Sequence, residues 1–371
     1  MKLCNCDIHQ LKNIAEKKKF ICFGAGKEFF DFFSDFKKLH LERHLYAVAD
    51  NNTEKIGTEL DVEGASVPVI GIGNLLQVRD MFLLISCADL EGVVRQLENY
   101  DELKNVPCFA AYFVRSETNK TYERNHNYPD CFRITGMPCI PKKIHYCWFG
   151  KKEIPEKNRN WMKSWKKYCS DYEIIRWDES NYDVSKNRYM YEAYQNKKWG
   201  FVSDYARIDI IYNYGGIYLD TDVELLKSWE ELRYQDAFMG MEANLRINLG
   251  LGFGSVPYYG LWKDLLDLYD ELHFVREDGT WNQLPCPQLQ NDIYLRRGFI
   301  NNGEYQRIDQ AVIYPPAVFS PKDLYTGEVL FTSHTYSIHH YDGSWVDDRQ
   351  RDKDCVRRKM YTHFKNISGE G

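Results

Sequence analysis

The stretch that decides the fold, Phe201 to Val223, reads FVSDYARIDIIYNYGGIYLDTDV. Large side chains recur in it at i, i+4, i+7 and i+11, the spacing of a buried helical stripe: they are Phe201, Tyr205, Ile208 and Tyr212. The glycines at 215 and 216 predict the end of this helix, because glycine adopts positive φ freely. The apolar residues 217–219 then predict a short buried strand, and Asp220-Thr221-Asp222 follows as a loop.

The two carboxylates of this loop are the first candidate for chemistry. Asp220 and Asp222 are two residues apart, so in an extended loop they point the same way and can converge on one cation. Oxygen ligands of this kind select Mg²⁺ or Mn²⁺, which bind through one or two carboxylates together with phosphate oxygens. Asp204 and Arg207 share one face of the preceding helix, which the short turn aims at the loop. An ordinary acidic turn could have the same Asp-Thr-Asp sequence. The position of this loop, after a buried strand and beside the Asp204–Arg207 face, is what favours a metal site completed by a nucleotide diphosphate.

Outward from this stretch, the first 115 residues predict a separate domain. Short apolar segments alternate with helical patterns there, which is typical of a Rossmann-like parallel sheet. The first segment ends in Gly24-Ala25-Gly26, and Asp50 ends the second. Phe29 stands where a dinucleotide-binding motif would have its third glycine, so the pattern supports the fold more than a bound dinucleotide.

The remaining chain divides in two. Residues 116–138 are polar and lack periodicity, which predicts a linker, and residues 139–371 form the second domain. The tail, 347–365, mixes basic and acidic residues and predicts a solvated helix.

Composition excludes several classes of protein. The 371 residues carry 48 basic and 54 acidic side chains, a net charge of −6, which argues against a nucleic-acid binder. The 11 cysteines lack paired spacing, so we interpret them as reduced thiols of a cytoplasmic protein. No apolar run resembles a signal peptide or approaches the ~20 residues that span a bilayer, so we expect neither secretion by that route nor insertion.

Two further segments of the second domain carry candidate residues. In IPKKIHYCWFG (140–150), Trp148 lies near the end of a predicted strand, where parallel α/β sheets bind ligands, although a core position is the simpler interpretation for a single Trp. In TYSIHHYDGSW (335–345), two histidines, Asp342, Ser344 and Trp345 lie close together. We expect this cluster to close over the diphosphate and to supply a further metal ligand.

Four segments in this order resemble the D-x-D sugar-transferases of glycosyltransferase family 32: IPKKIHYCWFG, SWKKYCSDYEIIRWD, FVSDYARIDIIYNYGGIYLDTDV and IHHYDGSW. The central one is also similar to the catalytic segment of the large bacterial glucosylating toxins. The resemblance implies a GT-A type α/β domain and retaining transfer from a nucleotide-sugar with Mn²⁺ or Mg²⁺. A UDP-sugar is favoured over a GDP-sugar.

The resemblance also implies roles for individual residues. Trp148 would stack on the base, Asp204 and Arg207 would hold the donor sugar, and Tyr218 would line its site. Asp220 would reach the ribose and, through water, the metal, whereas Asp222 would coordinate the metal directly. Trp345 would contact the leaving diphosphate, with Ser344 beside it, and His340 or Asp342 would complete the metal shell. The family's Thr-Gly-Pro segment is replaced here by PCPQLQND (285–292), so acceptor-side residues are not assigned.

The resulting expectation is a glycosyltransferase of capsular or exopolysaccharide synthesis, acting on a glycan or a lipid-linked acceptor. That acceptor would bring a cytoplasmic protein to the inner face of the membrane, where peripheral contact stays an open alternative. Two other functions stay open as well. One is a nucleotide-binding regulatory protein with an inactive transferase domain, and the other is a sugar-phosphate transferase.

Overall fold

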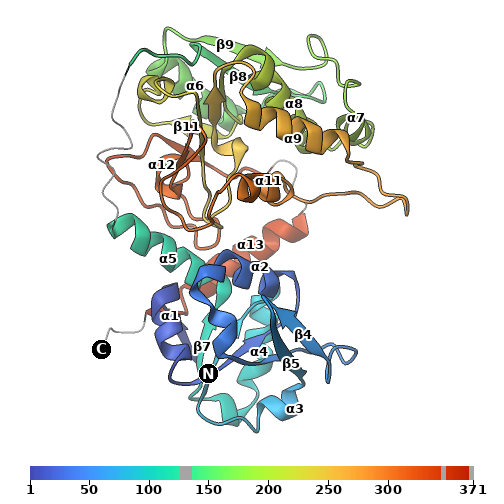
Figure 1. The fold of residues 1–371 in the computed structure, drawn as a ribbon, viewed down its shortest axis with the longest axis vertical. Coiled ribbons are helices and arrows are strands. Elements are labelled where there is room, and N and C mark those ends of the chain that lie inside the picture. Colours follow the sequence, from blue (N-terminus) through green and yellow to red (C-terminus); the bar gives the residue numbers. More distant parts are fainter. Residues whose placement is uncertain (126–135, 344–347, 367–371) are drawn as a thin grey trace. The chain divides into compact units, whose positions relative to one another are not determined.

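The computed structural model describes residues 1–125, 136–343 and 348–366, and the chain forms two compact units (Figure 1). Unit 1 comprises Met1–Asn125, Asp323–Glu328 and Asp347–Gly371. Unit 2 comprises His126–Lys322 and Val329–Val346. The chain therefore enters unit 1 three times, which differs from the predicted division at a single linker.

Unit 1 is built on an eight-stranded sheet whose strands run parallel except for the pair β4–β5. The strand order is β17 (Lys365–Asn366), β1 (Lys2–Asn5), β7 (Pro107–Ala110), β6 (Met81–Ile85), β2 (Lys19–Phe23), β3 (Leu45–Ala49), β5 (Ala65–Ile70) and β4 (Glu59–Val62). The helices are α1 (Ile8–Ala15), α2 (Lys27–Asp35), α3 (Ile72–Leu75), α4 (Leu90–Glu98), α5 (Ala111–Asn125) and α13 (Asp348–Tyr361). The predicted alternation of strands and helices is thus present as a parallel α/β sheet.

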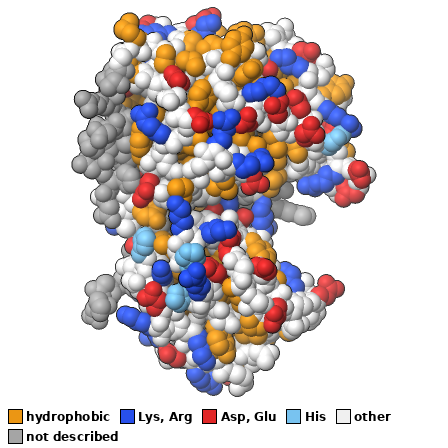
Figure 2. Space-filling view, viewed as in Figure 1, with side chains coloured by type: hydrophobic (Ala, Val, Ile, Leu, Met, Phe, Trp, Pro, Cys, Tyr) orange, Lys and Arg blue, Asp and Glu red, His pale blue; other side chains and the backbone are white. Residues whose placement is uncertain are grey.

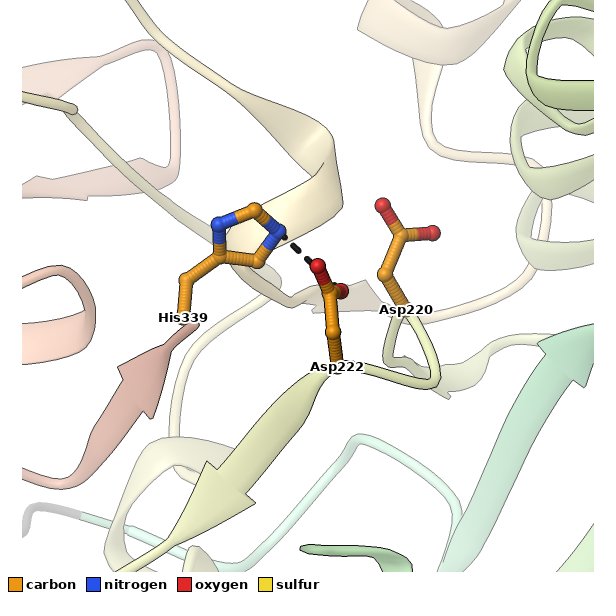
Figure 3. Close-up of side chains that lie close together, drawn as sticks. All are labelled: Asp220, Asp222 and His339. Carbon is orange, nitrogen blue, oxygen red and sulfur yellow. Dashed lines mark ion pairs between the residues drawn. The ribbon is translucent and has the colours of Figure 1, made fainter. Parts of the chain in front are cut away.

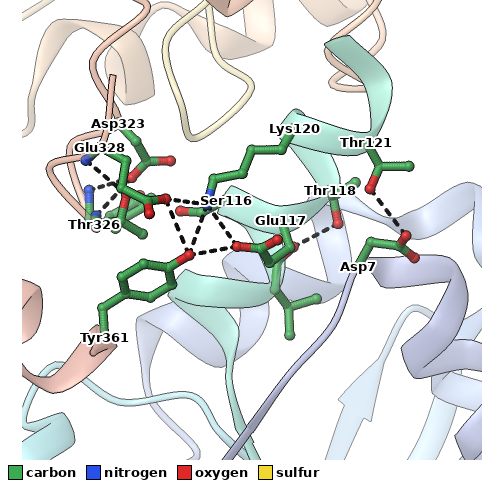
Figure 4. Close-up of polar contacts among 12 residues, drawn as sticks. Asp7, Ser116, Glu117, Thr118, Lys120, Thr121, Asp323, Thr326, Glu328 and Tyr361 are labelled. Carbon is green, nitrogen blue, oxygen red and sulfur yellow. Dashed lines mark hydrogen bonds and ion pairs between the residues drawn. The ribbon is translucent and has the colours of Figure 1, made fainter. Parts of the chain in front are cut away.

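The polar stretch predicted as a linker begins as part of helix α5, which continues to Asn125. Most of its polar side chains are buried, and several take part in a network of hydrogen bonds and ion pairs (Figure 4). Lys120 Nζ donates to Glu117 Oε1 and to the Tyr361 hydroxyl, each over 2.8 Å, and it also pairs with Glu328. Burial of these groups is affordable because they satisfy one another, and this is why polarity misled the sequence-based prediction. Residues 126–135, the middle of the predicted linker, lie outside the described part of the chain.

The C-terminal segment belongs to unit 1 and not to the second domain. Helix α13 is present as predicted, but Arg357 on it is buried, with its guanidinium 4.1 Å from the Tyr112 ring centroid. Strand β17 pairs with β1, and Phe364 joins the core of unit 1. The tail therefore completes the N-terminal sheet instead of lying free in solvent.

Unit 2 contains a seven-stranded mixed sheet and a two-stranded ladder. The sheet order is β14 (Gln306–Ile308), β15 (Ala311–Tyr314), β12 (Ala237–Gly240), β13 (Phe253–Ser255), β10 (Gly216–Tyr218), β8 (Lys143–Cys147) and β9 (Glu173–Trp177). The ladder pairs β11 (Val223–Leu225) with β16 (Ser337–His339) in antiparallel fashion. The helices are α6 (Glu156–Tyr168), α7 (Arg188–Gln195), α8 (Trp199–Tyr214), α9 (Gly260–Asp270), α10 (Cys286–Leu289), α11 (Asn291–Arg296) and α12 (Pro316–Phe319).

Helix α8 confirms the predicted helix of the central stretch, but it is buried on nearly every side instead of along one stripe. Residues 204, 207 and 209, all charged, are buried together with the apolar ones, whereas Tyr212 of the predicted stripe is half-buried. The helix ends as predicted at Gly215 (φ 61°), and Gly216 (φ 98°) opens β10. A Cβ on Gly216 would lie 2.9 Å from the Lys143 carbonyl oxygen, so the turn requires glycine both for its backbone angle and for space.

The surface carries charges of both signs. On the face shown in Figure 2, basic and acidic side chains are interspersed over each unit, in keeping with the small net charge of −6. Among the described helices, none combines the length and the apolar character that crossing a bilayer would require.

Candidate active site

The carboxylates of Asp220 and Asp222 and the imidazole of His339 form one cluster (Figure 3). One ligand atom from each of the three lies within 4.8 Å of the others. Asp220 and Asp222 come from the loop between β10 and β11, and His339 ends β16. The antiparallel register pairs Val223 with His339, which is how a residue more than a hundred positions away reaches the D-x-D loop.

The structure places His339, and not the expected His340, beside the carboxylates. His339 Nε2 lies 3.3 Å from Asp222 Oδ1. His340 points elsewhere: its Nε2 is 2.8 Å from Glu224 Oε2, and its ring stacks on Trp161 at 4.1 Å. Successive side chains of an extended segment point to opposite faces, so only one of two adjacent histidines can face the loop. The sequence shows the pair but not which member faces inward.

The rest of the expected closing cluster contributes differently. Asp342 donates its backbone N–H to Asp222 Oδ2 over 2.9 Å, while its own carboxylate pairs with Lys157. Asp342 therefore orients a carboxylate of the cluster through its backbone, and its side chain is not a member of the cluster, contrary to expectation. Ser344 and Trp345 lie outside the described residues.

The predicted pair on α8 reaches the loop. Arg207 is buried, forms an ion pair with Asp204, and places Nη1 3.6 Å from Asp220 Oδ2. Its guanidinium also lies over the Tyr218 ring, 5.4 Å from the centroid, and the Tyr218 hydroxyl donates to Asp220 Oδ1 over 2.9 Å. Asp220 is thus held on one side by a cation and on the other by a hydroxyl. The structure brings together all four predicted residues, Asp204, Arg207, Tyr218 and Asp220.

Burial and neighbouring charges shift the pKa values of the cluster in opposite directions. Burial raises the pKa of Asp220 and the negative charge of Asp222 adds to the rise, although Arg207 opposes it. Burial would raise the pKa of Asp222 too, but His339 and hydrogen bonds outweigh it and lower that pKa to about 2. Burial would lower the pKa of His339, but Asp222 outweighs it and the pKa is raised. Burial also raises the pKa of Asp204 to about 6, even beside Arg207. A half-buried carboxylate and a buried one that repel each other are a setting that a cation would stabilise.

Two segments without an assigned role also approach these residues. The glycine-rich loop at Asn248–Pro257 brings Gly250 so close that a Cβ there would lie 2.5 Å from Asp220 Oδ2 and 3.1 Å from Arg207 Nη1. The thiol of Cys286, in the segment that replaces Thr-Gly-Pro, hydrogen-bonds the Asp204 carboxylate. Sequence reasoning missed Cys286 and His339, because both contacts depend on long-range packing. Gly250 had a local signal in its glycine-rich surroundings.

Trp148 lies directly after β8, as predicted, and is half-buried. Its indole Nε1–H donates to the Lys152 carbonyl over 2.7 Å, which fixes the orientation of the ring. Its backbone N–H donates to the Trp177 carbonyl over 2.9 Å, so the residue continues the pairing of β8 with β9. The stacking role assigned to it stays a prediction.

The cluster fits a divalent cation by its donor chemistry. Two carboxylates and an imidazole can each offer one atom to the same point, and carboxylate-rich sites of this kind suit Mg²⁺ or Mn²⁺. His339 Nδ1 is buried and has no hydrogen-bond partner among the described residues, so the ring is oriented by Asp222 at Nε2 and by the Tyr341 ring, whose centroid lies 4.4 Å away.

Comparison with known sequences finds a match that includes the D-x-D loop. Residues 155–239 match the family described as "Glycosyltransferase sugar-binding region containing DXD motif". Two curated proteins of Schizosaccharomyces pombe (strain 972 / ATCC 24843) are similar to parts of the chain. Inositol phosphoceramide mannosyltransferase 3 is 36% identical over 104 residues, which is 27% of this chain and 29% of that protein. Inositol phosphoceramide mannosyltransferase 2 is 29% identical over 132 residues, 34% of this chain and 37% of that protein. The chain thus matches about a third of the length of these relatives.

Two solved structures are similar to part of the chain. The PaToxG glycosyltransferase covers 50% of this chain and 78% of its own, with 19% identity and a TM-score of 0.36. A glycosyltransferase involved in glycosylation of the major capsid of PBCV-1 covers 58% of this chain and 98% of its own, with 15% identity and a TM-score of 0.30. These two likenesses do not bear on the chemistry of the chain.

Proposed function

We propose that this protein is a metal-dependent glycosyltransferase that moves a sugar from a nucleotide-diphosphate sugar to an acceptor hydroxyl, with retention of the anomeric configuration. The observation that carries the proposal is the cluster of Asp220, Asp222 and His339 beside the buried Asp204–Arg207 pair. The segment containing both carboxylates lies within the matched sugar-binding region.

Each group has a defined task in this proposal. Asp222, kept ionised by His339, and Asp220 would hold Mn²⁺ or Mg²⁺, which when bound supplies positive charge to the leaving diphosphate. Arg207 fixes Asp220 and presents a cation to the donor, and Asp204 accepts hydrogen bonds from sugar hydroxyls. Tyr218 orients the Asp220 carboxylate through the hydrogen bond that its hydroxyl donates. Trp148 would stack on the base of the donor.

The donor and acceptor are proposed by class. The two partly matching relatives are named as mannosyltransferases of inositol phosphoceramide, which supports a hexosyl donor and a lipid-linked or glycan acceptor here. A UDP-sugar remains the favoured donor, and the relatives' names add mannosyl donors to those worth testing. We place the reaction in capsular or exopolysaccharide synthesis, in the cytoplasm or at the inner face of its membrane.

A donor panel tests the proposal. Purified protein is incubated with UDP-, GDP- and CDP-sugars in the presence of Mn²⁺, Mg²⁺ or EDTA, and release of nucleoside diphosphate is measured. We expect release with at least one donor, loss of release in EDTA, and its return when Mn²⁺ is added back. The anomeric configuration of the released sugar, read by NMR before mutarotation, should match that of the donor.

Three outcomes would contradict separate parts of the proposal. Equal turnover in EDTA would remove the metal role, and an inverted anomer would remove retention. Absence of release with every donor, even with oligosaccharide or lipid-linked acceptors added, would remove the transferase activity itself.

A further inference from the structure

A groove of about 460 Å³ lies in unit 2, beside the end of β9 and the C-terminal end of α8. The aromatic side chains that line it are Trp177, Tyr182, Tyr214 and Tyr258, and its polar groups include Asp183, Lys186 and Asn213. The mechanism proposed above uses none of these residues. The groove is therefore a second candidate site on the same unit.

Two aromatic rings of the groove, those of Tyr214 and Tyr258, are held in place yet open to solvent. Tyr214 is 49% exposed and Tyr258 is 66% exposed, which is unusual for such large rings. The Trp177 and Tyr214 rings lie 5.2 Å apart, and the Trp177 indole N–H donates to His145 Nδ1 over 3.0 Å. Tyr258 has a φ of 59°, a strained angle for a residue with a side chain, and its backbone N–H donates to the Tyr212 carbonyl over 2.7 Å. Strain of this kind persists where surrounding contacts enforce it, and it often accompanies function.

The floor of the groove is a satisfied polar network centred on the buried Asp209. Asp209 Oδ2 accepts from the Tyr182 hydroxyl over 2.7 Å and from Lys186 Nζ over 2.5 Å. Its Oδ1 accepts from Asn213 Nδ2 over 2.9 Å. Lys186 remains partly exposed, and its ammonium has further N–H groups to donate. The network gives the groove a rigid base with hydrogen-bonding groups at its edge.

The charges of the groove favour a neutral ligand. Asp183 and Asp209 outweigh the single cation, Lys186, so the groove offers an unfavourable field to a diphosphate or another polyanion. The faces of aromatic rings carry partial negative charge, which attracts the weakly positive C–H faces of sugar rings. Carboxylate, amide and ammonium groups at the rim suit sugar hydroxyls, which both donate and accept hydrogen bonds.

We propose that this groove binds a neutral saccharide chain, at a site separate from the Asp220–Asp222–His339 cluster. Asp209 is two residues after Arg207 on α8, a rotation of about 200° around the helix axis, so the two side chains leave the helix on nearly opposite faces. Arg207 reaches the D-x-D loop, and Asp209 forms the groove floor. Binding of a saccharide in the groove does not depend on the proposed function. The identity of that saccharide as the growing acceptor glycan does rest on it.

Saccharide binding is tested without nucleotide-sugar or metal, so that its result is independent of transferase activity. Neutral hexasaccharides of mannose, glucose and galactose are added to the full chain, and binding is measured by saturation-transfer NMR and calorimetry. The double variant Tyr214→Ala/Tyr258→Ala removes both exposed rings. Tyr191→Ala is the matched control, because Tyr191 is 43% exposed on α7 and does not line the groove.

We expect at least one hexasaccharide to bind, and the double variant to weaken it by about tenfold or more, with an unchanged melting temperature. Tyr191→Ala should bind like the unaltered protein. Failure of all three hexasaccharides to bind, or equal binding by the double variant, would overturn the proposal. If binding is confirmed but no donor is turned over, the groove stands and the transferase proposal falls.

Discussion

Both units place carboxylates just after a strand of their sheet, but the surroundings of these carboxylates differ. In unit 1, Asp50 follows β3, and its oxygens accept backbone N–H groups: Oδ2 from Ala25 over 2.7 Å and Oδ1 from Asn52 over 2.8 Å. In unit 2, Asp220 and Asp222 follow β10 and lie close to each other and to His339. One carboxylate closes a turn, and the other two repel each other.

The difference shows that position at a strand end does not identify a ligand site. Asp50 occupies the place of a ribose-binding acid in dinucleotide folds, yet it ties the glycine turn after β2 to the next strand. Lys55 adds to this by donating to the Ala25 carbonyl over 2.8 Å. Because the Asp50 oxygens already have backbone partners, the geometry of this turn gives a structural reason for the acid. The pKa of Asp220 is raised by burial and by the negative charge of Asp222, and a cation held by both carboxylates would offset these two effects.

An Asp→Asn substitution at each strand end, at position 222 in unit 2 and at position 50 in unit 1, tests the comparison most directly. Asp222→Asn removes a charge from the cluster, and we expect donor turnover to fall on the order of 10³-fold, as when a preorganised electrostatic group is lost. Asp50→Asn should leave turnover within about twofold. Nucleoside diphosphate release with Mn²⁺ measures both, with Asp171→Asn as an exposed acidic control in unit 2. Equal losses at positions 222 and 50 would contradict the distinction.

Two buried histidines among the described residues of unit 2, His145 and His339, sharpen the comparison next, because their pKa values shift in opposite directions. Burial lowers the pKa of His145 to about 4, since its partners are neutral: Nε2 lies 3.0 Å from the Gly215 carbonyl, and Nδ1 accepts from Trp177. Above pH 6.5 His145 is neutral in both the folded and the unfolded protein. Between pH 6.5 and 4 the unfolded state binds the proton first, so stability should fall by about 3 kcal/mol.

Urea unfolding of the intact protein and of His145→Gln, followed through the pH range 7 to 4, measures this effect. The variant should be less stable at pH 7 but lose less stability as the pH falls to 4, because it lacks the His145 imidazole while all other titrating groups are the same in both proteins. Parallel pH curves for the two proteins would show that His145 is not the group responsible.

His339, which ends β16, and His340, which follows it, form a matched pair of positions for a smaller effect, on metal affinity. His339→Ala should weaken Mn²⁺ binding about 10- to 100-fold, because it removes a member of the cluster and the partner of Asp222. His340→Ala should change Mn²⁺ affinity by less than about threefold, since it loses a contact with Glu224 on the other face. Calorimetric titration of both variants decides between them, and a larger loss in His340→Ala would restore the sequence-based choice.

The smallest expected effect is on the stability of unit 1. Asp50→Asn keeps the size of the side chain but weakens the hydrogen bonds to Ala25 and Asn52, which should cost about 1 kcal/mol. Hydrogen exchange in β2 and β3 should accelerate about fivefold if these strands exchange through opening of that unit. Asp101→Asn, an exposed acid in unit 1, is the control, and unchanged exchange in Asp50→Asn would remove its structural role.

Local spacing was enough to predict the centre of the site. The helix that became α8, the glycine turn, the strand β10 and the D-x-D loop follow from residues within 23 positions of one another. Their backbone preferences and side-chain periods are short-range properties, so they are visible in the sequence. Convergence of Asp204, Arg207 and Asp220 follows from the same short connection.

Tertiary structure decided what reaches that centre. His339 rather than His340 faces the carboxylates because the β11–β16 register pairs it with Val223, and a shift by one residue would exchange the two. Cys286 meets Asp204 through packing of helix α10, some eighty residues further along the chain. The polar face of α5 is buried because Glu328 and Tyr361, from two later segments, supply its partners. Such contacts depend on which distant segments pair, and local composition carries no record of that pairing.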